Sequence, residues 1–266
     1  MFRLLALVCG LAATPLPAAA ELPPGIVDVE ILPGWRTERG THMAGLSISL
    51  APGWKTYWRA PGDTGIPPEF LWSDIDNVAA MHLHWPVPEV ARSNGMRSIV
   101  YDGSVVIPME FALDAPGAAR AEGVLELGVC ADICLPVQVP VAVALPPVGG
   151  RRDPGIVAGL ADRPLSESEA GVQGVTCRVS PAGDGLALVA DIEMPPVAGR
   201  EDVVVEAGNP AVWVSEPETV RRGGTLSAAV RMVHNSGRPF ALDRSAVRIT
   251  VLGETRAVDI RGCDAR

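Results

Sequence analysis

The stretch VLELGVCADICLPVQVPVAVAL (residues 124–145) contains two valine-rich apolar segments on either side of a short loop with two cysteines. Short apolar runs rich in β-branched residues are typical of strands. We therefore predict strands at residues 124–129 and 137–145, joined by the segment from Cys130 to Cys134. If these strands run antiparallel, the three intervening residues bring the two cysteines within disulfide range.

Similar segments recur on both sides of this pair. Strands are predicted at residues 27–32, 43–50, 70–72, 80–85, 99–101 and 104–113, and again at intervals over residues 175–260. Asp102-Gly103 has the signature of a tight hairpin turn between two of them. The 28 glycines and 25 prolines suit many short strands and turns. The sequence thus predicts an all-β protein with two immunoglobulin-like β-sandwiches in tandem.

The order of the segments suggests the domain boundaries. Residues 1–20 have a basic start at Arg3, an apolar run and small residues up to Ala20, as in a secretory signal peptide. We expect cleavage after Ala20, export to the periplasm and no membrane span in the mature chain. Residues 21–147 and 171–266 are predicted to form the two sandwiches. Residues 148–170 are predicted to be a linker with one short helix that starts near Asp153-Pro154.

The net charge of the chain argues against nucleic acid as a partner. The formal net charge is −9, and it becomes −10 without Arg3 (−9 − 1). An acidic chain without a basic stripe is not expected to bind nucleic acid.

Four cysteines remain after the expected cleavage, at positions 130, 134, 177 and 263. An even number in an oxidising compartment indicates two disulfides. A Cys130–Cys134 bridge closes so short a loop that it contributes roughly 2 kcal/mol, whereas Cys177–Cys263 closes a loop worth roughly 4.6 kcal/mol. The long loop indicates that Cys177–Cys263 is a structural disulfide that joins the beginning and the end of the second domain. The short one is more plausibly kept for redox chemistry, with a plain stabilising bridge or a metal site as alternatives.

The segment APGWKTYWRAPGDTGIPP (residues 51–68) is rich in aromatic residues and contains Lys55, the only lysine of the chain. A loop with this composition either packs against the core or covers something. Lys55, Asp63 and Asp132 are candidates for tuning the cysteine pair. Because the acidic Asp132 between the cysteines disfavours a thiolate, the pair is not expected to be a strong oxidant. It is better suited to being reduced by a partner and passing electrons on.

Four stretches in this order resemble the periplasmic N-terminal region of DsbD/ScsB-type thiol:disulfide interchange proteins: GWKTYWRAPGDTGIPPEFLW (53–72), LHWPVPE (83–89), SIVYDGSVVIPM (98–109) and LGVCADICLP (127–136). The second domain resembles the second immunoglobulin-like module of ScsB-like members. The resemblance implies that Cys130 and Cys134 relay electrons without a cofactor from a membrane-embedded thiol reductase to periplasmic thioredoxin-like proteins. It also makes the aromatic loop a candidate cap over the disulfide, with Tyr57 and Trp58 as shields.

The sequence departs from this family in containing neither a transmembrane electron-transfer domain nor a thioredoxin-like domain with a WCxxC motif. We therefore expect the electrons to come from another protein. The competing hypothesis is a non-catalytic binding module with two structural disulfides, which docks a partner or takes part in copper handling and copper tolerance. His82 and His84 lie on one face of a predicted strand and are half of a workable metal site, but we favour an exposed strand face without a metal.

Overall fold

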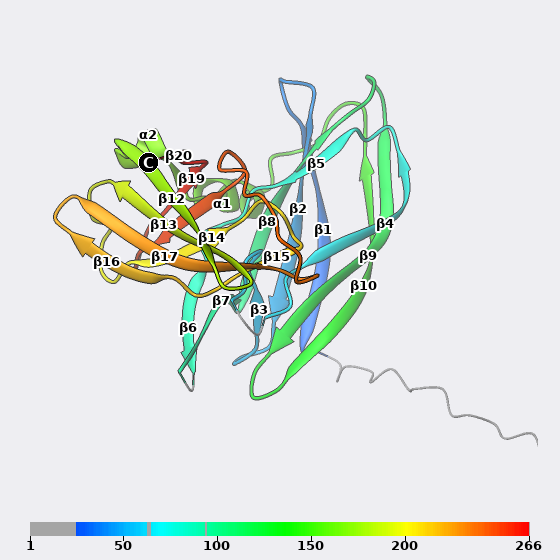
Figure 1. Cartoon of the computed structure of the whole chain (residues 1–266). Helices are drawn as coiled ribbons and strands as arrows, with labels where there is room; N and C mark the ends of the chain where they lie inside the picture. Colours follow the sequence, from blue (N-terminus) through cyan, green and yellow to red (C-terminus); the bar gives the residue numbers. More distant parts are fainter. Residues whose placement is uncertain (1–24, 63–64, 94, 266) are drawn as a thin grey trace, which may run out of the picture.

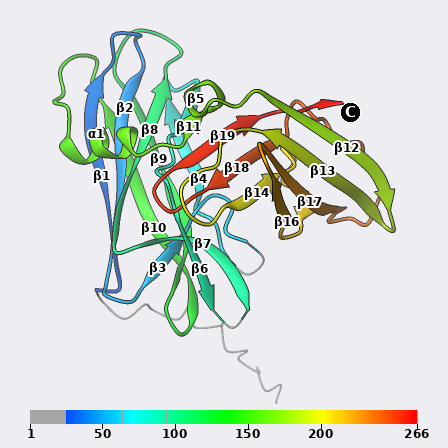
Figure 2. The ribbon, with the colours of Figure 1, turned by 90° about the vertical axis from the view of Figure 1, so that its left-hand side faces the viewer.

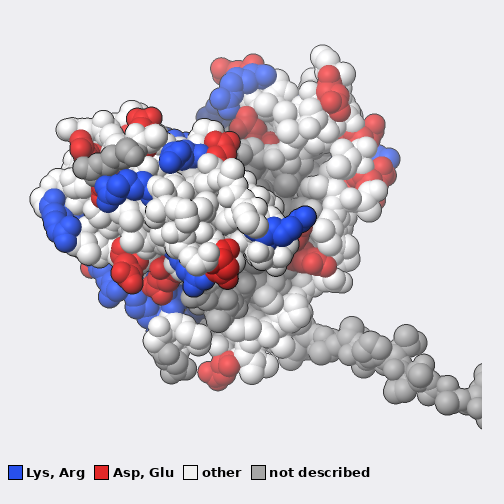
Figure 3. Space-filling view, viewed as in Figure 1, with Lys and Arg blue, Asp and Glu red and all other residues white. Residues whose placement is uncertain are grey.

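The computed structural model describes residues 25–62, 65–93 and 95–265, so the expected signal peptide (residues 1–20) and Asp63 lie outside the described residues. The fold is all-β, as predicted, with two β-sandwiches side by side (Figure 1). On the face of the molecule drawn in Figure 3, acidic and basic side chains lie interspersed over both halves.

The first sandwich packs a four-stranded sheet, in the order β1-β2-β8-β5, against a six-stranded sheet, in the order β10-β9-β3-β7-β6 with β4 also paired to β9. The largest fully buried side chains of its core include Trp58, Phe111 and Leu127. The strand bounds are β1 Val27–Arg36, β2 His42–Leu50, β3 Lys55–Tyr57, β4 Glu69–Asp76, β5 Ala80–Leu83, β6 Glu89–Ser93, β7 Met96–Asp102, β8 Ser104–Ala112, β9 Ala119–Cys130 and β10 Cys134–Leu145.

The second sandwich packs a four-stranded sheet, in the order β11-β19-β18-β14, against a six-stranded sheet, in the order β15-β17-β13-β12-β20 with β16 also paired to β17. Two of its pairings, β11 with β19 and β12 with β20, are parallel. The strand bounds are β11 Leu165–Ser166, β12 Gly174–Ala182, β13 Gly185–Glu193, β14 Asp202–Glu206, β15 Val212–Val214, β16 Glu218–Arg222, β17 Thr225–His234, β18 Arg248–Leu252, β19 Ala257–Arg261 and β20 Asp264–Ala265.

The short helix α1 (Pro154–Ala161) lies between the two sandwiches in the sequence, and α2 (Glu167–Ala170) follows β11. The Asp153 side chain caps α1 by accepting hydrogen bonds from the backbone N–H groups of Gly155 and Ile156. Ile156 is fully buried and packs against Gly45 of β2, where a side chain would collide with it. The helix is therefore docked on the first sandwich.

The prediction of a β-hairpin at Asp102-Gly103 is wrong. Gly103 does make a turn with a φ of +71°, but the strands on its two sides do not pair. β7 pairs with β3 and β6, whereas β8 pairs with β2 and β5. The chain therefore crosses here from one sheet of the sandwich to the other.

The sheet of β11, β14, β18 and β19, which we call the interdomain sheet, faces a hydrophobic core on each side. Since side chains alternate along a strand, Val203 and Val205 of β14 enter the core of the second sandwich and Val204 enters that of the first. Leu252 of β18 and Ala257 of β19 also pack into the first core. Figure 2 shows this sheet between the first sandwich and the other sheet of the second sandwich, so the two sandwiches share a packed interface.

Candidate functional site

The hairpin of β9 and β10 places the two cysteines side by side. The two strands pair antiparallel without a register shift from Ala119–Leu145 to Cys130–Cys134, as predicted for this part of the chain. The Cys130 and Cys134 Cα atoms are 4.1 Å apart and the two residues form a disulfide. Three exposed residues close the loop, with the N–H of Ala131 donating to the carbonyl of Ile133 at 3.0 Å. The disulfide thus lies at the tip of the longest hairpin of the first sandwich.

Tyr57 lies against both sulfurs. Its hydroxyl oxygen is 3.2 Å from Sγ of Cys130 and 3.3 Å from Sγ of Cys134, and its side chain is buried. Burial raises the pKa of the Tyr57 hydroxyl, which keeps the group protonated and able to donate a hydrogen bond to a sulfur.

Two glycines make room for the Tyr57 ring. A Cβ atom at Gly65 would lie 2.7 Å from one ring edge carbon, and a Cβ atom at Gly128 would lie 2.9 Å from another. The backbone also closes over the ring, since the N–H of Gly128 donates to the carbonyl of Ile66 at 3.2 Å. Tyr57 is therefore held between β9 and the segment that follows β3.

Lys55 and the two cysteines share one line across the sheet. Asp102 of β7, Lys55 of β3, Cys130 of β9 and Cys134 of β10 are successive partners in the strand register. We call these four residues the cysteine row. Directly opposite residues point to the same face of a sheet with Cβ atoms about 5 Å apart, so Lys55 is the cross-strand neighbour of Cys130. The Lys55 ammonium is 3.0 Å from the carboxylate of Asp102, and both side chains are partly exposed.

The two cysteines differ in their exposure to solvent. Cys134 is exposed, whereas Cys130 is half-buried between its neighbours on β3 and β10. Ile133 beside them is 62% exposed, which is high for a large apolar side chain. An incoming group therefore reaches Cys134 first and meets Ile133 on the way.

Two other residues singled out in the sequence are Trp58 and Asp132. Trp58 directly follows β3 and is fully buried in the core, where the guanidinium of Arg59 lies 3.6 Å from the centre of its ring. Asp132 is exposed in the hairpin loop. Sequence reasoning did not single out Gly65, Gly128 or Arg59, because only their neighbours in space show why they are needed.

The second disulfide joins Cys177 and Cys263, whose Cα atoms are 5.7 Å apart. Cys177 lies on β12 and is fully buried in the core of the second sandwich. Cys263 immediately precedes β20, which pairs with β12 at the same place. This bridge fixes the last described strand of the chain to the first long strand of the second sandwich.

His82 and His84 were the sequence's only candidate metal ligands beside the cysteines. Their ring centres are 4.8 Å apart in an edge-to-face arrangement, and Nε2 of His84 is 3.0 Å from Oε2 of Glu110. Burial lowers the pKa of His82, and the charges of His84 and Arg261 lower it further. Within the described part of the chain, no three His, Cys, Asp or Glu side chains are placed to hold a metal ion together. Nor does any helix of those residues have the length and hydrophobicity to span a bilayer.

Comparisons with known sequences and structures show what this chain is similar to. A search of curated protein sequences finds no match. The crystal structure of the N-terminal periplasmic domain of ScsB from Proteus mirabilis resembles the chain with a TM-score of 0.66 and 20% sequence identity, over 95% of this chain and 97% of that one. At this identity the likeness shows a common fold, which extends over both sandwiches. Residues 28–146, which include Tyr57 and both cysteines of the hairpin, match the family model described as "Thiol:disulfide interchange protein DsbD, N-terminal". This segment of the chain is therefore similar to the N-terminal domains of DsbD.

Proposed function

We propose that this chain is a periplasmic thiol–disulfide exchange protein that passes reducing equivalents through Cys130 and Cys134. The observation that carries the proposal is the unequal setting of the two cysteines. Cys134 is exposed, whereas Cys130 is half-buried near the Tyr57 hydroxyl and is the cross-strand neighbour of Lys55. A purely stabilising bridge does not need one exposed and one half-buried cysteine under a tyrosine hydroxyl.

In this proposal the electron donor is a membrane-embedded thiol reductase, and the acceptors are periplasmic thioredoxin-like proteins. No cofactor takes part. The signal peptide is residues 1–20, the first sandwich with the cysteine pair is residues 21–147, and residues 148–170 connect it to the second sandwich at 171–266. Tyr57 shields the disulfide, and Trp58 supports that shield from within the core.

The reaction is two successive exchanges. A donor thiolate attacks Sγ of Cys134, the Cys130–Cys134 bond breaks, and Cys130 leaves as a thiolate that takes up a proton. The second donor thiol, after losing its proton, attacks the mixed disulfide and releases Cys134. Two electrons and two protons have then passed to the pair, and the donor holds a disulfide. Cys134 next attacks an acceptor disulfide, and Cys130 resolves the mixed disulfide, so that the pair is oxidised again and the acceptor is a dithiol.

The first test is selective reduction of the folded protein. We expect reduced thioredoxin to open Cys130–Cys134 while Cys177–Cys263 stays oxidised, because Cys134 is exposed and Cys177 is fully buried. Alkylation of free thiols followed by peptide mass spectrometry measures both bridges in one sample. If both bridges resist reduction until the protein unfolds, the exchange function is wrong and the binding module is favoured.

The second test concerns Lys55. A nearby positive charge lowers a thiol pKa and makes the thiolate a better leaving group, so Lys55→Met raises the pKa of the Cys130 thiol. We expect this change to slow reduction by a small thiol about threefold for each unit of leaving-group pKa. Lys55→Arg keeps the charge and serves as the control.

Asp102→Asn supplies a change of the opposite sign, because it removes the carboxylate that neutralises Lys55. We expect it to speed the same reaction. The Cys130 pKa itself is measured from thiolate absorbance in a Cys134→Ala background. Equal rates for Lys55→Met, Lys55→Arg and the unaltered protein contradict the role given to Lys55.

A further inference from the structure

The interface between the two sandwiches is built next to the candidate site. On β14, Asp202, Val204 and Glu206 are alternate residues, so their side chains all point to the first sandwich. Val204 packs into the first core, and the two carboxylates on either side of it pair with arginines of the first sandwich. One of these arginines, Arg59, lies on the segment that directly follows Tyr57.

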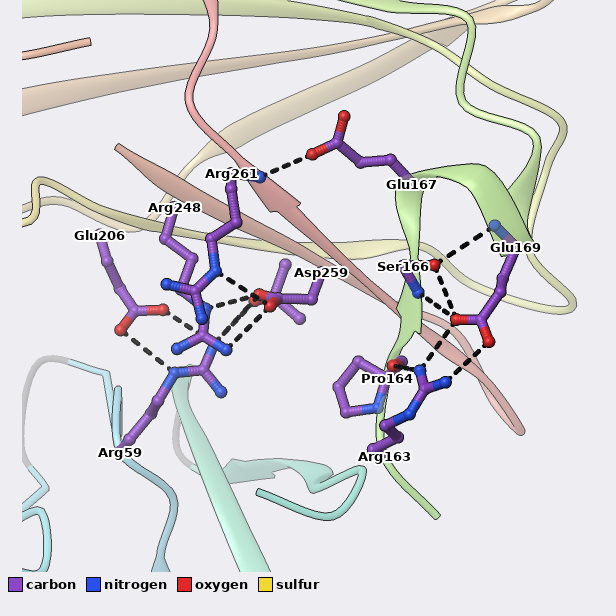
Figure 4. Close-up of polar contacts among 11 residues, drawn as sticks. Arg59, Arg163, Pro164, Ser166, Glu167, Glu169, Glu206, Arg248, Asp259 and Arg261 are labelled. Atoms are coloured by element: carbon purple, nitrogen blue, oxygen red, sulfur yellow. Dashed lines mark hydrogen bonds and ion pairs between the residues drawn. The ribbon is translucent and has the colours of Figure 1, made fainter. Parts of the chain in front are cut away.

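Arg59 makes the central contact. It follows Trp58 directly and is two residues from Tyr57. Its side chain is only 9% exposed, and its guanidinium lies 3.3 Å (Nε) and 3.0 Å (Nη2) from the two carboxylate oxygens of Glu206. Nη2 also donates to the hydroxyl of Thr250 at 2.9 Å and lies 3.8 Å from Asp259. Figure 4 shows Arg59 reaching from the first sandwich into this group, where the guanidinium groups of Arg248 and Arg261 also approach the carboxylate of Asp259.

Arg97 makes a second contact of the same kind. Its Nη1 donates to the carbonyl of Val203 on β14 at 2.9 Å, and its Nε lies 3.1 Å from Glu216. The backbone of Arg97 in turn supports the segment after β3, because a side chain at Gly62 would come within 2.6 Å of the Arg97 carbonyl oxygen. Arg92 on the neighbouring strand β6 pairs with Asp202.

Backbone hydrogen bonds join these contacts to the site. The N–H of Trp58 donates to Ile99 and the N–H of Ile99 donates to Pro61, both at 3.0 Å, so the chain that leaves Tyr57 is fixed to β7 beside Arg97. Farther along, Ile66 is fixed to β9 beside the cysteines. The chain that follows Tyr57 is therefore fixed at two places. Near the cysteines it is bonded to β9, and beside the interdomain sheet it is bonded to β7.

We propose that the second sandwich positions the redox site, with Arg59 and Glu206 as the positioning residues that hold Tyr57 against the disulfide. This inference rests on the proposed exchange function of Cys130 and Cys134. Neither positioning residue touches the sulfurs. They act by fixing the backbone from Trp58 to Pro61, so a loosened Arg59–Glu206 contact gives small thiols better access to the disulfide.

The test compares two glutamate variants of the full chain. Glu206→Gln removes the charge that faces Arg59 but keeps a hydrogen-bond acceptor there. Glu201→Gln is the matched control, because Glu201 is similarly shielded and pairs with Arg221 wholly inside the second sandwich. We expect glutathione to reduce the Cys130–Cys134 bridge about fivefold or more faster in Glu206→Gln, as for sites coupled through a fold, and at an unchanged rate in Glu201→Gln.

A spectroscopic readout separates positioning from general loss of stability. The chain has only two tyrosines, Tyr57 and Tyr101, so ring-labelled tyrosine gives two assignable NMR signals. In Glu206→Gln we expect the Tyr57 signal to titrate at lower pH than in the unaltered protein, because burial raises its pKa in the native site. If Glu206→Gln does not fold, Thr250→Val removes another Arg59 contact with almost no change of shape.

The outcomes are distinct. Faster reduction and an altered Tyr57 signal in Glu206→Gln or Thr250→Val, but not in Glu201→Gln, support the inference. If the unaltered protein exchanges with glutathione and the Arg59-contact variants behave identically to it, the positioning role is overturned while the exchange function stands. A Cys130–Cys134 bridge that never exchanges in the folded unaltered protein overturns both.

Discussion

Cys130→Ala accumulates a disulfide-linked complex with its redox partner, whereas Cys134→Ala does not. The exposed Cys134 thiolate can attack a partner disulfide without Cys130. Release of the partner then requires Cys130 to attack the mixed disulfide. Without Cys130 the mixed disulfide persists. Without Cys134 the remaining thiol is half-buried beneath Tyr57 and meets no partner sulfur. Non-reducing gels of periplasmic extracts, with mass spectrometry of the trapped band, measure the difference.

The double variant Cys130→Ala/Cys134→Ala is the control and should trap nothing. Equal trapping by the two single variants would show that access to solvent does not select the attacking sulfur. A complex that forms with Cys134→Ala alone would reverse the assignment of the two cysteines.

The double variant Cys177→Ala/Cys263→Ala loses the most stability. Its bridge closes a sequence separation of 86 residues and anchors β20 to the fully buried Cys177 on β12. The chain-entropy estimate gives a loss of about 4.6 kcal/mol in the free energy of unfolding, against about 2 kcal/mol for removal of the Cys130–Cys134 bridge. Urea unfolding of the two double variants measures both values.

We expect the thiol–disulfide exchange activity of the two double variants to follow the opposite order. At temperatures where Cys177→Ala/Cys263→Ala is folded, it keeps the exchange reaction of Cys130 and Cys134. Similar losses of stability in the two double variants would contradict the division into one structural and one reactive bridge.

The sequence predicted the cysteine hairpin well because its information is local. Two apolar segments and a three-residue loop define β9, β10 and the position of both cysteines, and no distant partner is needed. The same local reasoning failed at Asp102-Gly103. The dipeptide favours a turn, but whether the flanking strands pair with each other depends on β2 and β3, which lie about 50 residues earlier in the chain.

The site around the hairpin was predictable only in part. Tyr57 and Trp58 were both named as shields, yet Tyr57 lies against the sulfurs whereas Trp58 is fully buried in the core, and the pattern did not reveal this difference. Lys55 became a neighbour of Cys130 only through the pairing of β3 with β9. Arg59 has no local signal at all, because its partners Glu206 and Thr250 belong to the other sandwich.

The position of Cys134 at the margin of its sheet also sets a direction of approach. Disulfide exchange is an in-line displacement in which the incoming sulfur lies on the extension of the bond that breaks. β10 is the last strand of its sheet, so the line from Cys130 through Cys134 continues outward past the final strand. The reverse line runs across β3 and β7, over Lys55 and Asp102. The stereochemistry of the displacement thus favours attack on the sulfur of Cys134, with the sulfur of Cys130 as the leaving group.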